Sequence, residues 1–154
     1  MATCSQVHDS CCTARRPGRG PGHINGSQNH FACRSDQAHR DLGSGNGAGD
    51  FLFIAGMRGI NPTSNDLVAG DDARVRQAFL NMQLIAESEG ASLRDAVRLV
   101  VYVTDMIRFR PIVNKVQAEL WGQGPYPPRT IVEVQRLNQD DLVEVEGTFY
   151  VPAR

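Results

Sequence analysis

From Phe51 onward the chain contains neither histidine nor cysteine. This absence excludes thiol and imidazole catalysis from that part of the chain. All four cysteines lie within the first 33 residues, so they cannot staple the rest of the fold as a disulfide framework does. Cys4, His8, Cys11 and Cys12 could ligate a metal, but they form no CxxC pair and no second ligand pair at zinc spacing. The sequence therefore favours free thiols on an N-terminal tail over a metal site.

The chain also lacks a strong net charge and a long apolar run. Its formal net charge is −1, which creates no strong field toward nucleic acid or an anionic membrane. No apolar run approaches the ~20 residues of a membrane-spanning helix, and residues 1–20 contain no apolar segment typical of a signal peptide. We therefore expect a cytoplasmic protein that binds neither nucleic acid nor membrane.

Composition changes sharply along the chain. Residues 1–30 are rich in Gly, Ser, Cys, Arg and His and almost free of aliphatic side chains. Such a segment cannot bury enough apolar surface to offset the entropy lost on ordering. We predict a flexible N-terminal tail over residues 1–30 and one folded domain over residues 31–154. The glycine-rich stretch 41–50 lacks the order of a phosphate-binding loop and is predicted to be a flexible connection.

Hydrophobic periodicity from Phe51 onward predicts the order strand, helix, strand, helix, strand, strand. The first helix is predicted to begin near Asp71 and to end at Gly90, and Pro111 is placed in the first turn of the second helix. Two helices with one apolar face each can cover one side of a sheet, which indicates an α+β fold with a single mixed sheet. An apolar second face would favour an oligomer. The predicted strands cover residues 51–57, 96–105, 130–134 and 142–151, and the apolar stripe of the first helix consists of Val75, Ala78, Phe79, Met82, Ile85 and Ala86.

Three motifs within residues 51–151 resemble the Rid family of proteins, also called YjgF. The stretch "AGMRGINP" is similar to the family's SGQxPxNP pattern, "PPRTIVEV" to its P-x-R segment followed by V-E-V, and "VEVEGTF" to its EIEAxA strand. The motifs occur in the family's order. The resemblance implies a chorismate-mutase-like fold and a homotrimer with substrate clefts between its subunits.

Arg129 stands where a proline-rich turn becomes a strand. From the residues alone, an arginine at a strand end is usually solvated or paired with a surface carboxylate. However, Pro127 and Pro128 stiffen the backbone before it, and a guanidinium matches a carboxylate in a bidentate geometry. The resemblance implies that Arg129 is the essential arginine that grips the substrate carboxylate.

The last strand places Glu144 and Glu146 on one face and Val143 and Val145 on the other. A solvated face is the ordinary interpretation of such a pair, but the resemblance assigns to Glu144 the positioning or activation of water. It also implies substrate binding by Gly56, Asn114 and Ile131. Without the resemblance, Asn114 would be interpreted as a surface polar group of the second helix.

The reaction that the resemblance implies is the hydrolysis of a 2-imino or 2-enamino acid to the 2-keto acid and ammonia. Orientation of a carboxylate and a water supplies most of the effect, and a neighbouring carboxylate can move the proton. No metal, nucleotide or other cofactor is required. Two alternatives remain. One is a metabolite-binding or chaperone-like trimer without turnover. The other is an endoribonuclease, which is disfavoured because this part of the chain lacks both histidines and a basic surface.

Two departures from the family pattern concern the substrate. Ser35 stands where the family usually has a tyrosine at the cleft, and Arg58 replaces a residue that is often apolar. Side chains two apart on a strand share a face, so we expect Arg58 to lean toward the cleft beside Gly56. The pair would suit a dicarboxylic enamine such as 2-aminomuconate rather than short imino acids such as 2-aminoacrylate or 2-iminobutanoate. The alternative is that the strand ends before Arg58 and its side chain is solvated.

Overall fold

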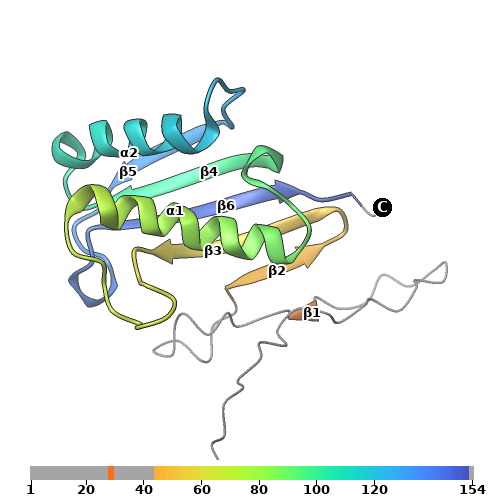
Figure 1. Cartoon of the computed structure of the whole chain (residues 1–154), viewed down its shortest axis with the longest axis horizontal. Helices are drawn as coiled ribbons and strands as arrows, with labels where there is room; N and C mark the ends of the chain where they lie inside the picture. Colours follow the sequence, from red (N-terminus) through yellow and green to blue (C-terminus); the bar gives the residue numbers. More distant parts are fainter. Residues whose placement is uncertain (1–27, 30–43, 153–154) are drawn as a thin grey trace, which may run out of the picture.

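The computed structural model describes residues 28–29 and 44–152, which form one mixed β-sheet with two α-helices (Figure 1). The strand order is β1-β2-β3-β6-β4-β5. Neighbouring strands are antiparallel except β4 and β5, which are parallel and are connected through α2. The strands are β1 (Gln28–Asn29), β2 (Gly45–Ala48), β3 (Phe51–Arg58), β4 (Ala96–Val103), β5 (Arg129–Glu133) and β6 (Val143–Tyr150). The helices are α1 (Asp71–Ser88) and α2 (Met106–Trp121), with short 3₁₀ turns at Leu93–Asp95 and Asn138–Asp140.

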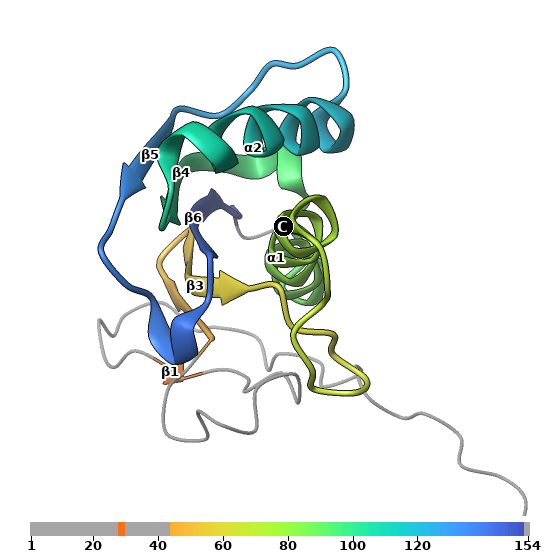
Figure 2. The same ribbon diagram turned by 90° about the vertical axis from the view of Figure 1, so that its left-hand side faces the viewer.

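The two helices cover the same face of the sheet, as Figure 2 shows in the view turned by 90°. The core between the two layers is made by alternate residues of the central strands and by the apolar stripes of the helices. Leu99 and Val101 on β4 and Val143 and Val145 on β6 are fully buried there. Burial of each such side chain stabilises the fold by about 1.5–3 kcal/mol. The predicted α+β fold is confirmed, and all six residues of the predicted stripe on α1 are buried.

The opposite face of the sheet carries exposed aromatic side chains. Phe53 is 48% exposed and Tyr150 is 44% exposed. The ring of Phe51 packs against Tyr150 with 5.5 Å between the centroids. Within the described residues, no helix packs on this face. A sheet face with several large apolar side chains in water is typical of an interaction surface.

The glycine-rich stretch at 41–50 is not a flexible connection over its described part, 44–50. Residues 45–48 form β2, which pairs with β3 in an antiparallel register. Gly45 explains how a glycine-rich segment suits this place: a Cβ there would lie 3.2 Å from Cγ2 of Ile85 on α1. The strand is held by backbone hydrogen bonds rather than by side chains, which is why an apolar alternation did not reveal it.

Helix α2 begins earlier than the sequence predicts. Asp105 caps it, because its Oδ1 accepts a hydrogen bond of 3.0 Å from the backbone N–H of Arg108. Aspartate is among the preferred residues at this position. Pro111 is therefore the sixth residue of the helix rather than part of its first turn. The early start extends α2 along β5.

Neither helix in the described ranges is long and apolar enough to cross a membrane. Most of the predicted tail, the four cysteines and Ser35 lie outside the described residues. Within residues 1–30, Gln28 and Asn29 form β1 and pair with β2.

Candidate active site

Arg129 is the first residue of β5, the strand at one edge of the sheet. It lies opposite Leu99 of β4, whose side chain is buried under the helices, so Arg129 projects to the helix-covered side. The preceding backbone is tied into the sheet, because Leu99 N–H donates a hydrogen bond of 2.9 Å to the carbonyl of Pro128. The origin of the guanidinium is thereby fixed, as the prolines before it led us to expect.

Two amide side chains of α2 hold the guanidinium of Arg129. Its Nη2 donates to Oδ1 of Asn114 at 2.6 Å, and its Nη1 donates to Oε1 of Gln117. Asn114, which the sequence singled out, is thus beside Arg129. Gln117 was missed, although it lies one turn of the helix beyond Asn114 on the same face and is only 5% exposed. Its position three residues after Asn114 is the signal that could have revealed it.

The charge on Arg129 is not neutralised within the described residues, where it makes no ion pair with a carboxylate. Partial burial lowers its pKa, and the positive charge of Arg110 on α2 lowers the pKa further. An arginine remains protonated despite such shifts. The result is a fixed, unpaired cation oriented by neutral oxygens, which is a suitable arrangement for binding a carboxylate.

Glu144 lies on the other side of the sheet. Its neighbours Val143 and Val145 are fully buried toward the helices, and the alternation of β6 turns Glu144 to the face without helices. The carboxylate reaches across to β3 at the bulge between Ile54 and Met57. A Cβ on Gly56 would stand 1.7 Å from Oε1 of Glu144, so only glycine leaves room for this carboxylate. Glu144 and Gly56, which are both predicted site residues, are therefore close in space.

Tyr102 of β4 flanks this carboxylate face, and the sequence did not single it out. It lies opposite Glu144 in the register of β4 and β6. Burial raises the pKa of its hydroxyl, and the charge of Glu146 and a hydrogen bond to it raise the pKa further. Tyr102 therefore stays neutral and can donate a hydrogen bond at neutral pH.

Within one chain, the predicted site residues fall into two halves on opposite faces of the sheet. Arg129, Asn114 and Ile131 belong to the helix side, where Ile131 packs against the core. Gly56 and Glu144 belong to the opposite side. A β-sheet separates these halves, so one substrate cannot contact both within a single chain.

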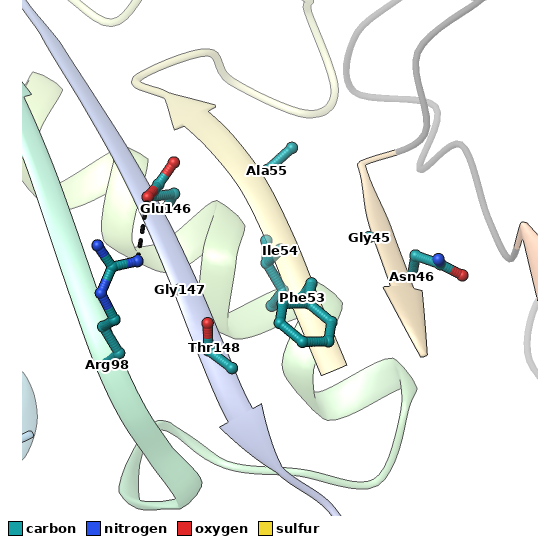
Figure 3. Close-up of a pocket in the computed structure, with 9 residues that line it drawn as sticks. All are labelled: Gly45, Asn46, Phe53, Ile54, Ala55, Arg98, Glu146, Gly147 and Thr148. Carbon is teal, nitrogen blue, oxygen red and sulfur yellow. Dashed lines mark ion pairs between the residues drawn. The ribbon is translucent and has the colours of Figure 1, made fainter. Parts of the chain in front are cut away.

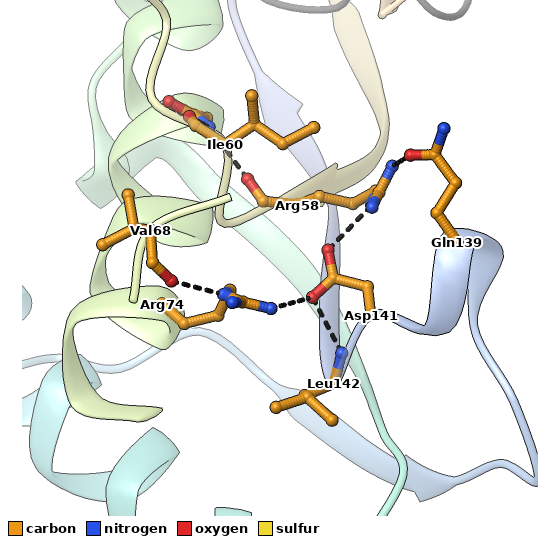
Figure 4. Close-up of polar contacts among 8 residues, drawn as sticks. Arg58, Ile60, Val68, Arg74, Gln139, Asp141 and Leu142 are labelled. Carbon is orange, nitrogen blue, oxygen red and sulfur yellow. Dashed lines mark hydrogen bonds and ion pairs between the residues drawn. The ribbon is translucent and has the colours of Figure 1, made fainter. Parts of the chain in front are cut away.

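Arg58 lies opposite Glu144 in the register of β3 and β6, but its side chain has its own buried partners. It is 5% exposed, and its Nε donates to Oδ2 of Asp141 at 2.8 Å (Figure 4). Its Nη1 donates to Oε1 of Gln139 at 2.8 Å, and Oδ1 of Asp141 accepts from Nη1 of Arg74 at 3.0 Å. The expected alternative of a solvated side chain is wrong, because the side chain is buried in an ion pair. The guanidinium is already bound to a carboxylate of its own chain.

A pocket of about 430 Å³ opens on the face without helices, between β2, β3, β6 and β4 (Figure 3). Arg98 and Glu146 stand at its wall with 3.7 Å between their charged groups, and Phe53 stands on β3. Neither Arg129 nor Glu144 lines it. This pocket is therefore not the site that the sequence motifs indicate. It lies within the exposed apolar face, where it is open to solvent.

The family model described as Endoribonuclease L-PSP matches residues 39–151. A protein of Dermatophagoides farinae named 2-iminobutanoate/2-iminopropanoate deaminase is 34% identical over 106 residues, which cover 67% of this chain and 80% of that protein. A solved structure from Rhodopseudomonas palustris, described as a probable translation initiation inhibitor, is 52% identical. It covers 73% of this chain and 88% of its own, with a TM-score of 0.72.

The solved structure of the YjgF gene product of Escherichia coli is 27% identical to the chain. It superimposes with a TM-score of 0.68 over 72% of this chain and 88% of that one. The predicted chorismate-mutase-like fold is confirmed by this likeness.

Proposed function

The chain belongs to the Endoribonuclease L-PSP family, which includes the Rid and YjgF proteins, and on this premise we propose that it is an enzyme that deaminates 2-imino acids. The reaction adds water to the imine carbon and releases the 2-keto acid and ammonia. The relative named 2-iminobutanoate/2-iminopropanoate deaminase supports this reaction class.

The observation that carries the proposal is the environment of Arg129. Two amide oxygens orient its guanidinium without neutralising it, and no described carboxylate pairs with it. A substrate carboxylate is the missing partner, and a charged hydrogen bond of this kind contributes about 1.5–3 kcal/mol. The carboxylate bound to Arg129 would fix the adjacent C=N carbon for attack.

Glu144 supplies the proton transfer in this proposal. A water held by its carboxylate attacks the imine carbon, a C–O bond forms, and the proton passes through Glu144 to the nitrogen. The hydroxyl proton of the resulting carbinolamine then passes through the same carboxylate to the amino nitrogen. The C–N bond breaks as the C=O bond forms, and the 2-keto acid and ammonia leave. General base catalysis requires the carboxylate within hydrogen-bond reach of the water, and Gly56 provides the space in which the carboxylate lies. The reaction needs no metal or other cofactor.

The separation of Arg129 and Glu144 on opposite faces of the sheet supports a shared site. We propose that the edge of one subunit, with Arg129, lies against the exposed sheet face of the next, with Glu144. A closed ring of such contacts is a heterologous assembly, and a homotrimer is the ring that we propose. Nucleic acid and membrane are not partners in this proposal, and the protein would act in the cytoplasm.

For the substrate, the name of the Dermatophagoides farinae relative supports the class of 2-imino acids, of which 2-iminopropanoate and 2-iminobutanoate are short members. A dicarboxylic enamine such as 2-aminomuconate, bound through Arg58, remains the second candidate from the sequence. It would require Arg58 to leave the buried carboxylate of Asp141, and breaking such a pair is costly, typically about 3–5 kcal/mol. The contacts of Arg58 therefore count against that route to a second carboxylate.

The test is a coupled assay in which an amino-acid oxidase generates the imine and formation of the keto acid is compared with the rate without the protein. We expect acceleration by the wild type and at least a tenfold loss in Arg129→Ala, as the loss of ~1.5–3 kcal/mol requires. Arg136→Gln is the matched control, because Arg136 is exposed and, among the described residues, its ion pair is with Asp140.

Equal rates for Arg129→Ala and the wild type would refute the role of Arg129. Binding of keto acids without any acceleration would favour a metabolite-binding protein. Cleavage of RNA that Arg129→Ala abolishes would favour the ribonuclease named by the family description.

A further inference from the structure

Almost every cationic side chain in the described part of the chain has an anionic or carbonyl partner. Arg110 and Arg129 are the exceptions: Arg110 makes no ion pair or hydrogen bond with a described residue, and Arg129 contacts only neutral amides. Arg94 binds two backbone carbonyls. The remaining cations pair with carboxylates, and they are Arg58, Arg74, Arg76, Arg98, Arg108, Lys115 and Arg136.

These two arginines are neighbours along one edge of the molecule. Helix α2 and strand β5 lie alongside each other in opposite directions: Gln117 contacts Arg129, and at the other end Met106 N–H donates a hydrogen bond of 2.6 Å to Glu133. Arg110 precedes Asn114 by four residues, so it lies on the same helix face about 6 Å further along the axis. It therefore stands beside the middle of β5, which Ile131 occupies.

Two unpaired like charges in such a position are unfavourable. Arg110 is close enough to Arg129 to lower its pKa, which means that each charge destabilises the other. The fold does not require an arginine at position 110, since this side chain is exposed and contributes nothing to the core. An anion that meets both guanidinium groups would remove the repulsion and gain two charged contacts.

We propose that Arg110 binds the distal carboxylate of a 2-imino dicarboxylic acid whose other carboxylate is held by Arg129. This inference rests on the proposed deaminase function and specifies its substrate class. One helical turn separates Arg110 from Asn114, which holds the guanidinium of Arg129, and this spacing with two long side chains suits an acid of four or five carbons. The apolar side chain of Ile131 would lie against the methylene groups between the two carboxylates.

In this proposal Arg110, and not Arg58 as the sequence suggested, binds the second carboxylate of the substrate. Arg58 is buried and paired with Asp141, whereas Arg110 is exposed and unpaired on the same side of the sheet as Arg129. The competing occupant is a carboxylate of a second copy of the chain, which could pair with Arg110 in an assembly. The experiment below separates the two.

The test compares the wild type with Arg110→Gln on imines of two kinds. The imines of aspartate and glutamate carry a second carboxylate, and those of alanine and 2-aminobutyrate do not. We expect Arg110→Gln to lose at least tenfold in kcat/KM on the dicarboxylic imines and less than twofold on the others. Arg108→Gln is the control, because it removes the same charge from the same helix at a residue paired with Asp71.

A second readout does not depend on turnover. Titration with the keto acids 2-oxoglutarate and 2-oxobutanoate should show tighter binding of the dicarboxylate, and Arg110→Gln should abolish this preference. An equal effect of Arg110→Gln on both classes, or a loss of the assembled state in sedimentation, would overturn the inference and assign Arg110 to a subunit contact. Failure of the proposed function has a different signature, namely no acceleration with any imine.

Discussion

Gly56 and Glu144 depend on each other, since the carboxylate occupies the space in which any larger residue would place its Cβ. The atoms in conflict are the far end of a flexible side chain and not backbone. A methyl group at position 56 would therefore displace the carboxylate without breaking the sheet. This separates the effect on chemistry from the effect on folding.

Gly56→Ala should lower kcat/KM for imine hydrolysis by at least tenfold, because the general base leaves its position by more than the small tolerance that catalysis allows. The melting temperature should change by only a few degrees, since about 1 kcal/mol corresponds to roughly 2–4 °C in a domain of this size. Gly47→Ala is the matched control, because the nearest atom of the described residues, the carbonyl oxygen of Phe51, would lie 3.9 Å from a Cβ there. Unchanged activity in Gly56→Ala would show that the position of Glu144 is not critical.

For single residues, the sequence could predict the site residues that stand in motifs, but not those that reach the site only through long-range packing. Arg129 and Glu144 stand in motifs, and the alternation of β6 correctly predicts the face of Glu144. Gln117 belongs to no motif, and a glutamine on a helix is ordinarily a surface residue. Its importance arises only because α2 lies over β5, which is a long-range contact that periodicity does not contain.

Three elements meet at the carboxylate of Asp141, which precedes β6. Arg58 reaches it from the end of β3, and Arg74 reaches it from the first turn of α1 (Figure 4). Asp141 is 1% exposed, and its backbone lies where the chain enters the strand that carries Glu144. One buried carboxylate between two arginines therefore connects the helix layer with β3 and β6, the two strands that carry Gly56 and Glu144.

Asp141→Asn should destabilise the protein strongly, because it leaves two arginines without their anion, one of them fully buried. Removal of one partner of a buried ion pair typically costs about 3–5 kcal/mol. The measurement is the free energy of unfolding in urea at neutral pH. Asp140→Asn, at an exposed neighbour whose ion pair within the described part of the chain is with Arg136, should cost less than about 1 kcal/mol. Similar losses in the two variants would mean that the network contributes little.

Elements with strong periodicity, such as α1 and the central strands, could be predicted from the sequence, and weakly patterned ones could not. Strand β2 is made of glycine, asparagine and alanine, so its pairing with β3 rests on backbone hydrogen bonds. The sequence predicts the start of α2 too late, because Pro111 favours a first helical turn around itself, whereas the helix begins at the capping Asp105. Pro111 has no N–H, yet the helix continues through it from Asp105.

For the whole molecule, the main consequence of the fold is that the two faces of the sheet differ in what covers them. One face of the sheet is closed by helices, and the other exposes Phe51, Phe53 and Tyr150 around an open pocket. The unpaired Arg129 lies at the edge of the sheet. A single chain thus offers an apolar face with a carboxylate and an edge with a cation, and the proposed shared site joins the two between copies.

The strongest test of this arrangement mixes two inactive variants. Arg129→Ala lacks the cation and Glu144→Gln lacks the base, so each alone should show little deamination. If every site takes Arg129 from one chain and Glu144 from its neighbour, mixed assemblies formed by refolding the two together should regain roughly a quarter of the wild-type sites in a ring with random subunit order. The measured quantity is the rate of imine hydrolysis after mixing, with each variant refolded alone as the control. Sedimentation of the same samples reports whether they are trimers.

Phe53→Arg should prevent both assembly and recovery, because it places a charge in the apolar face. A mixture that stays inactive although it forms mixed trimers, or a monomer with full activity, would place both groups in one chain's site and contradict the shared site.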